Sequence, residues 1–200
     1  MNQTQPPPSG PSINTTSDND HQSASEKPFR WHLWYILATW FGSGDLRPAP
    51  GTWGTIASLP LMLAVGWLIT YLEFEAFSSH AFISLAAILF ITGLWSTKHY
   101  TRKIPADGPD PKTIVIDETT GLAVTFAFVA EPLPTDLAAW GWIAAAVILF
   151  RFFDILKPCP ICTIDQKCKG AWGVMADDIL AGLAAGMVIL FLQTFDGALL

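Results

Sequence analysis

The sequence predicts an all-α integral membrane protein, a helical bundle of four to five spans preceded by a short re-entrant or interfacial helix. Hydrophobic residues make up 51% of the 200 residues, charged residues only 14%, and the mean hydropathy is +0.38. This composition is typical of membrane proteins. Long apolar stretches also recur along the chain, with Lys and Arg confined to alternate connections. A basic stripe or nucleic-acid motif is missing from the sequence, which argues against DNA or RNA binding.

Residues 1–29 are expected to form a disordered tail, and residues 30–200 a single membrane domain. The tail is rich in Pro, Ser, Asn, Thr and Gln, and such a composition cannot bury a core. It also lacks the basic start and apolar centre of a signal peptide. The stretch WHLWYILATWF at 31–41 is apolar but too short to span a bilayer. We therefore expect it to form an interfacial or re-entrant helix.

Up to five membrane spans follow this short helix. The expected spans are residues 55–73, 79–97, 114–130, 137–153 and 175–195. Each is only just long enough to cross about 30 Å of hydrocarbon, so a compact soluble helical bundle is the alternative architecture. The third span is the weakest, because Asp117 and Glu118 lie in its first turn.

The positions of Lys and Arg predict the orientation. With the N-terminus inside, five spans place residues 1–54, 98–113 and 154–174 on the cytoplasmic side. All 11 Lys and Arg residues lie in these segments, except Arg151, which lies at the inner end of a span. The connections on the other side carry acidic residues instead. This is a positive-inside pattern, and it predicts an external C-terminus.

The first polar segment on the cytoplasmic side is GSGDLRPAPGTWGTIASLP, residues 42–60. Its glycines let the backbone approach a ligand, and the following helix offers free amide groups at its N-terminus. Together with nearby hydroxyls these groups predict a phosphate cradle. The candidate phosphate-binding residues here are Gly42, Ser43, Gly44, Gly51, Thr52 and Thr55. The alternative interpretation is a Gly/Pro turn that caps a helix.

Two pairs of acidic residues begin apolar segments. Asp117 and Glu118 lie in TIVIDETTGL, and Asp177 and Asp178 lie in GVMADDILAG. Burying two ionised carboxylates together is costly without a cation, and hard divalent metals bind such oxygens. A solvated helix start explains one acid readily, because acids suit the helix dipole. Two pairs at the same depth favour a metal site.

The stretch FRFFDILKP, residues 150–158, contains Arg151, Asp154 and Lys157. A spacing of three places them on one helix face. The arginine and lysine suit phosphate oxygens, although anchors at the membrane edge with an ion pair are the alternative. The predicted topology brings all four polar segments to one membrane face. Together they indicate metal-assisted phosphate chemistry on a lipid headgroup.

Three cysteines, Cys159, Cys162 and Cys168, share one connection. A zinc site would need a second ligand pair at recognisable spacing, and the sequence lacks one. We interpret these residues as reduced cytoplasmic thiols.

Five motifs in order resemble the phosphatidylglycerophosphatase A family. They are GSG at 42–44, PGTWGT at 50–55, IDE at 116–118, FRFFDILKPCPI at 150–161 and GVMADDILAG at 173–182. The resemblance extends over nearly all of the chain from 30 to 195. It implies an Mg²⁺-dependent phosphatase, embedded in the bacterial inner membrane with its site on the cytoplasmic face. Such an enzyme converts the lipid phosphatidylglycerophosphate to phosphatidylglycerol and phosphate, the last step of phosphatidylglycerol synthesis.

The site residues follow from this resemblance and from their chemistry. The expected Mg²⁺ ligands are drawn from Asp117, Glu118, Asp154, Asp177 and Asp178. The expected catalytic residues are Arg151, Asp154, Lys157 and Asp178, with Arg151 and Lys157 also binding phosphate. Direct attack by water and an aspartyl-phosphate intermediate are both open. The alternative function is a small cation transporter or channel that uses the buried acids. The sequence makes no prediction about oligomeric state.

Overall fold

The computed structural model describes residues 32–103, 111–130, 133–157 and 171–199, and the regular structure in these ranges is helical with no strand. The predicted all-α class is confirmed. The expected disordered tail and the three cysteines lie outside the described residues.

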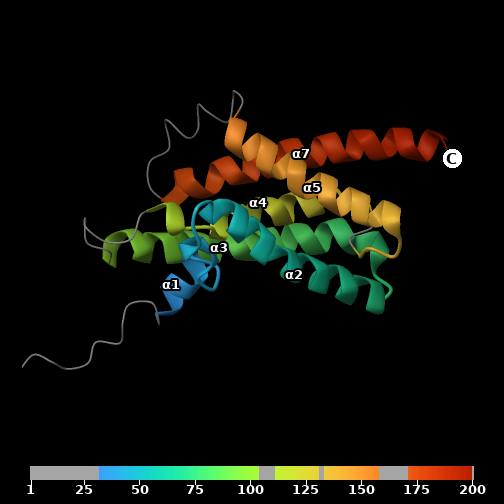
Figure 1. Cartoon of the computed structure of the whole chain (residues 1–200). Coiled ribbons are helices and arrows are strands. Elements are labelled where there is room, and N and C mark those ends of the chain that lie inside the picture. Colours follow the sequence, from blue (N-terminus) through green and yellow to red (C-terminus); the bar gives the residue numbers. More distant parts are fainter. Residues whose placement is uncertain (1–31, 104–110, 131–132, 158–170, 200) are drawn as a thin grey trace, which may run out of the picture.

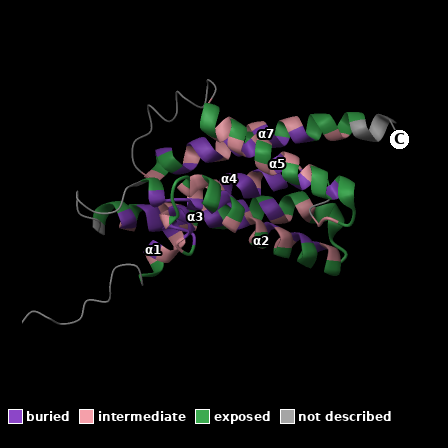
Figure 2. Cartoon of the chain, in the orientation of Figure 1, coloured by how far each residue is buried: buried purple, intermediate pink, exposed green. Residues whose placement is uncertain are grey.

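Four long helices run side by side through the length of the molecule (Figure 1). They are α2 (Pro50–Tyr71), α3 (Ser78–Lys103), α5 (Leu137–Leu156) and α7 (Ala171–Leu199). Each is long and apolar enough to cross a membrane. Their outward faces carry large exposed hydrophobic side chains, such as Trp67, Ile88, Ile148 and Phe191 (Figure 2). So much exposed apolar surface suits lipid better than water, which favours a membrane bundle over the soluble alternative.

The expected span at 114–130 is wrong. This segment forms α4 (Ile116–Phe126), a helix of 11 residues that rises only about 16 Å. It is packed among the four long helices, with the side chains of Leu122 and Phe126 fully buried. A central helix of this kind is as apolar as a spanning helix, because its neighbours replace lipid around it.

Glycines allow α4 and α7 to approach closely. A Cβ atom on Gly121 would collide with the carbonyl oxygen of Asp178, and one on Gly182 would collide with the carbonyl of Gly121. Gly186 lies against the ring of Phe128 in the same way. The spacing of Gly182 and Gly186 therefore serves helix packing. This close contact also brings together the two acidic pairs, which lie in the first turn of α4 and the second turn of α7.

Short elements gather at the end of the bundle where α2 begins. They are α1 (Leu33–Ala38), η2 (Ser43–Asp45) and η4 (Pro111–Thr113), while η3 (Glu75–Phe77) lies between α2 and α3. The ring of Tyr35 in α1 stacks on Tyr100 of α3, with 5.9 Å between ring centroids. The amide of Val115 donates to the carbonyl of Ala38 over 2.9 Å. The predicted short N-terminal helix is thus present, and it supports the segment that leads into α4.

Candidate active site

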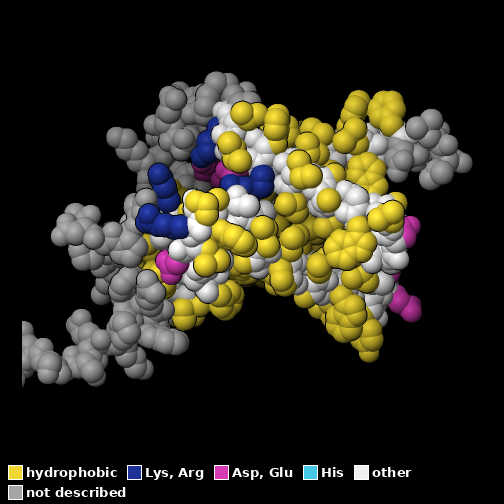
Figure 3. Space-filling model, in the orientation of Figure 1, with side chains coloured by type: hydrophobic (Ala, Val, Ile, Leu, Met, Phe, Trp, Pro, Cys, Tyr) yellow, Lys and Arg dark blue, Asp and Glu magenta, His cyan; other side chains and the backbone are white. Residues whose placement is uncertain are grey.

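A cavity of about 480 Å³ opens at this end of the bundle. The start of α2, the turn η4, the start of α4, the end of α5 and the start of α7 form its walls. Its polar lining consists of Gly51, Thr52, Lys112, Asp117, Glu118, Arg151, Asp154, Lys157, Asp177 and Asp178. Figure 3 shows acidic side chains in a recess with basic side chains on either side of it. Both predicted acidic pairs and the predicted charged face of α5 therefore meet in one site.

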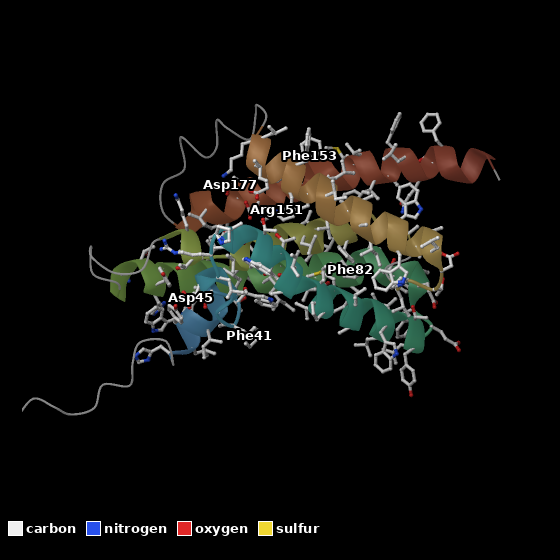
Figure 4. The ribbon with its side chains drawn as sticks, viewed as in Figure 1. Phe41, Asp45, Phe82, Arg151, Phe153 and Asp177 are labelled. Carbon is white, nitrogen blue, oxygen red and sulfur yellow. The ribbon has the colours of Figure 1, made fainter. Side chains whose placement is uncertain are left out.

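Ion pairs join α5 to α4 and α7. Arg151 Nη1 lies 2.7 Å from Asp154 Oδ2, one helical turn away, and 3.4 Å from Glu118 Oε1 of α4. Lys157, the residue that ends α5 with a positive φ of 40°, pairs with Asp177 of α7. Figure 4 shows Arg151 and Asp177 near each other at this end of the bundle. Arg151, Asp154 and Lys157 line the same cavity, but only Arg151 and Asp154 lie on a face of α5, because Lys157 follows its last residue.

Two carboxylate oxygens in the cavity have no hydrogen-bond partner among the described residues. Glu118 Oε2 and Asp178 Oδ2 are buried, and neither accepts a hydrogen bond from any residue that the structure describes. Leaving a polar oxygen buried without a hydrogen bond costs about 1–3 kcal/mol, and the cost is larger when the oxygen is charged. Such a cost is tolerated where a ligand supplies the missing interaction.

The charge in the cavity points to a divalent cation. Among the described lining residues, five carboxylates face three basic side chains, which leaves two negative charges uncompensated. Oxygen donors of this kind are those that Mg²⁺ prefers. No group of three or more His, Cys, Asp or Glu side chains in the described ranges already stands in metal-binding geometry. Ion pairs to Arg151 and Lys157 occupy several of the oxygens instead, and a metal would have to displace them.

The start of α4 shows the electrostatic effect of this crowding. Burial, together with the nearby charges of Asp177 and Asp154, raises the pKa of Asp117 to about 7. Burial also raises the pKa of Glu118 well above its usual range, and the charge of Asp117 adds to this. A bound cation would lower both pKa values and keep the two carboxylates ionised at neutral pH.

The helix α2 begins five residues earlier than predicted. Most of PGTWGT precedes the expected span at 55–73, but the stretch forms the first turns of α2, with Pro50 in the first helical position. Proline suits this position because its missing amide would have no helical partner there. The preceding Ala49 has no side chain that can cap the helix, so the first-turn amides at the cavity wall are open to an anion.

The structure brings all predicted metal and catalytic residues to this cavity, but only some of the predicted phosphate-binding residues. Gly51, Thr52, Arg151 and Lys157 line it, whereas Gly42, Ser43, Gly44 and Thr55 do not. The buried hydroxyl of Thr55 donates to the carbonyl of Gly51, and the hydroxyl of Ser43 donates to that of Thr39. Gly42, with φ of 86°, forms a turn before η2, and Gly44 lines a neighbouring cavity. These four residues therefore fit the alternative interpretation, a Gly/Pro turn that caps a helix, better than a phosphate cradle.

Lys112 is a site residue that the sequence did not reveal. It lies in η4 and lines the cavity. In the sequence, Lys112 lies in a basic connection, four residues before Ile116 and the acidic pair. This position is the signal that could have indicated its place in the site.

The family model for phosphatidylglycerophosphatase A matches residues 36–193, a range that includes every residue lining the cavity. The chain belongs to the phosphatidylglycerophosphatase A family. Membership in this family makes it a phosphatase.

Relatives of this phosphatidylglycerophosphatase A family member come from several bacteria. The phosphatidylglycerophosphatase A of Haemophilus influenzae is 35% identical over 80% of this chain and 88% of the relative. That of Escherichia coli is 32% identical over 80% of this chain and 83% of the relative. A protein of Bacteroides thetaiotaomicron, provisionally named phosphatidylinositol-3-phosphatase, is 33% identical over 77% and 89%. No solved structure matches the chain significantly.

In this family member, Gly51→Ala is expected to reduce phosphatase activity by about 10- to 100-fold, because small displacements of reacting groups have effects of this size. A Cβ atom at Gly51 would collide with Glu118 Oε1 and lie 3.0 Å from Arg151 Nη2. The measurement is the rate of phosphate release by the purified variant. Gly141→Ala is the matched control, because a Cβ at Gly141 meets nothing within 4 Å. Equal activity of both variants would show that the site does not need this close approach.

Proposed function

We propose that this chain hydrolyses phosphatidylglycerophosphate to phosphatidylglycerol and inorganic phosphate, with Mg²⁺, at the cytoplasmic face of a bacterial inner membrane. This reaction is the last step of phosphatidylglycerol synthesis. The observation that carries the proposal is one cavity that combines unpaired buried carboxylate oxygens with Arg151, Lys157 and an uncapped helix N-terminus. The family and two of its named relatives support the choice of substrate.

The substrate's terminal phosphate carries nearly two negative charges at neutral pH. Arg151 and Lys157 supply two positive charges, and the amides of Gly51 and Thr52 supply neutral donors. Donors already fixed in place stabilise charge that develops on the phosphoryl oxygens during reaction. Bound Mg²⁺, held by oxygens of the five carboxylates, would polarise the phosphoryl group and neutralise its charge.

The reaction breaks the bond between phosphorus and the glycerol oxygen, and that oxygen gains a proton. Asp178 is the residue we place nearest the reacting atoms, because its Oδ2 is buried and unpaired among the described residues. It either accepts a proton from attacking water or attacks phosphorus itself to form an aspartyl-phosphate that water then hydrolyses. Asp154 already bonds Arg151, and in our proposal it orients that guanidinium toward the phosphate.

The ends of the bundle support the proposed orientation. Figure 3 shows basic side chains gathered at the end that contains the cavity and acidic ones at the opposite end. Basic residues favour the cytoplasmic side of a membrane. A cavity at the ends of spanning helices also lies at the depth of lipid headgroups.

Packing beyond the cavity argues against the alternative of a cation transporter or channel. Leu122, Phe126 and Phe150 are fully buried along α4, and α4 lies in close contact with α7 at Gly121. The buried hydroxyls of Thr119 and Thr120 bond to backbone carbonyls one turn earlier. In the described part of the chain, the charged groups of the cavity thus stay at its end of the bundle and do not line a path through it.

The test is phosphate release from phosphatidylglycerophosphate in detergent micelles, with Mg²⁺ and with excess chelator. We expect release that requires Mg²⁺, returns when Mg²⁺ is added back, and exceeds release from phosphatidic acid. Phosphatidylinositol 3-phosphate is a second comparison substrate, because one relative is named for it. No release from any of these lipids by folded protein would refute the proposed function. Ion flux in liposomes without phosphate release would favour the transporter instead.

A further inference from the structure

A second, smaller cavity adjoins the first. Its volume is about 170 Å³, and its lining includes Gly44, Asp45, Arg47, Pro50, Lys112 and Thr113. Pro50 and Lys112 also line the larger cavity, so the two cavities are neighbours that share these residues. Neither Arg47 nor Lys112 is among the site residues expected from the sequence.

Close backbone contact builds this second cavity. A Cβ atom on Gly44 would collide with the carbonyl of Thr113, so the loop that follows α1 and the turn η4 touch at this glycine. The contact brings Arg47 from one segment and Lys112 from the other to the same cavity. This contact joins two segments that are far apart in the chain, and only glycine permits so close an approach.

The charges in the second cavity favour an anion. The hydroxyl of Tyr35 donates to the carboxylate of Asp45 over 2.7 Å, so this acid is bonded from the protein side. Arg47 is exposed, and it makes no hydrogen bond or ion pair with any residue that the structure describes. Its planar guanidinium can donate two parallel bonds to a phosphate group.

We propose that Arg47 and Lys112 bind a second phosphate of the substrate, the phosphodiester that links the headgroup to the lipid, while the terminal phosphate occupies the larger cavity. The proposal rests on the proposed function, because phosphatidylglycerophosphate carries both phosphates at the two ends of one glycerol unit. Lys112, shared by the cavities, contacts both groups. The second cavity then selects headgroups with two phosphates over phosphatidic acid, which has one.

Binding of soluble headgroup analogues tests this directly. Calorimetry with the detergent-solubilised full chain and Mg²⁺ compares glycerol 1,3-bisphosphate with glycerol 3-phosphate. We expect the wild-type protein to bind the bisphosphate about 10- to 100-fold more tightly, the range for one or two hydrogen bonds to a charged group. Arg47→Gln removes most of this preference but leaves binding of the monophosphate unchanged. Arg102→Gln, at an exposed position of α3 that lines neither cavity, keeps the preference.

Kinetics in neutral detergent provide the second measurement. Arg47→Gln should lower kcat/KM for phosphatidylglycerophosphate by the same factor, while Arg102→Gln should not. An unchanged bisphosphate preference in Arg47→Gln would overturn the proposal. So would a loss of activity seen only on anionic vesicles, since Arg47 would then bind the membrane surface in general. A wild-type chain that prefers the bisphosphate but releases no phosphate would instead refute the proposed function.

Discussion

Asp178→Asn is expected to lower the rate of phosphate release by about 10³-fold or more, the scale seen when a group acting on the reacting atoms is removed. Asp178 lies at the contact between α4 and α7, and its Oδ2 has no partner among the described residues. An amide of the same shape removes a buried charge whose Oδ2 accepts no hydrogen bond from the described residues. The variant should therefore melt at a higher temperature than the wild type when Mg²⁺ is chelated.

Activity and melting temperature of Asp178→Asn are measured on the same purified sample. Asp136→Asn is the matched control, because Asp136 lies at the start of α5 and its Oδ1 accepts a hydrogen bond from the amide of Ala139 over 2.8 Å. Asparagine caps helices about as well as aspartate, so both properties should stay unchanged. Activity of Asp178→Asn near that of the wild type would remove Asp178 from the catalytic machinery. A lower melting temperature would mean that its charge is already compensated in the metal-free protein.

Arg151→Gln is expected to abolish detectable activity, and Arg151→Lys to retain about 1–10% of it, since lysine keeps the charge but not the paired donors. Arg151 lies between two carboxylates, 2.7 Å from Asp154 and 3.4 Å from Glu118. Removing its charge leaves both acids without that partner, and loss of one member of a buried ion pair costs about 3–5 kcal/mol. Arg151→Gln should therefore also lose stability, while Arg151→Lys should lose much less.

The comparison of these two Arg151 variants separates catalysis from folding. Initial rates at saturating and limiting substrate give kcat and kcat/KM, and thermal unfolding in detergent gives the change in stability. If Arg151→Lys were fully active, the bidentate geometry of the guanidinium would be unnecessary. If Arg151→Gln were folded and active, Arg151 would serve only to anchor the end of α5, the alternative that the sequence left open.

The site was more predictable than the architecture around it. Two acidic pairs and the charged face around Arg151 were recognisable because each lies in apolar sequence. A charged side chain is costly there and indicates a functional site. Once the spans were oriented, these groups had to meet at one face. The start of α2 was also readable, since Pro50 suits a first helical position. The expected span nevertheless begins later, because the glycines of PGTWGT are also typical of a turn.

Other features depend on contacts that sequence does not reveal. A helix surrounded by protein and one surrounded by lipid are both apolar, so hydropathy could not show that α4 ends at Phe126. Lys112 joins the site only because Gly44 lies against Thr113. Thr55 faces away because its hydroxyl bonds the carbonyl of Gly51 within the same helix. The first two outcomes are decided by tertiary packing, whereas the orientation of Thr55 is decided within its own helix.

The central position of α4 has a consequence for how the chain is made. With two acids in its first turn and only 11 residues, α4 is a poor substrate for insertion into lipid by itself. It is stable there only when α7 covers it, and α7 follows both α4 and α5 along the chain. The same helix brings Asp177 and Asp178. Assembly of the membrane domain and assembly of the catalytic centre are thus one event, completed only once α7 has been made, and a nascent chain that stops before α7 has neither.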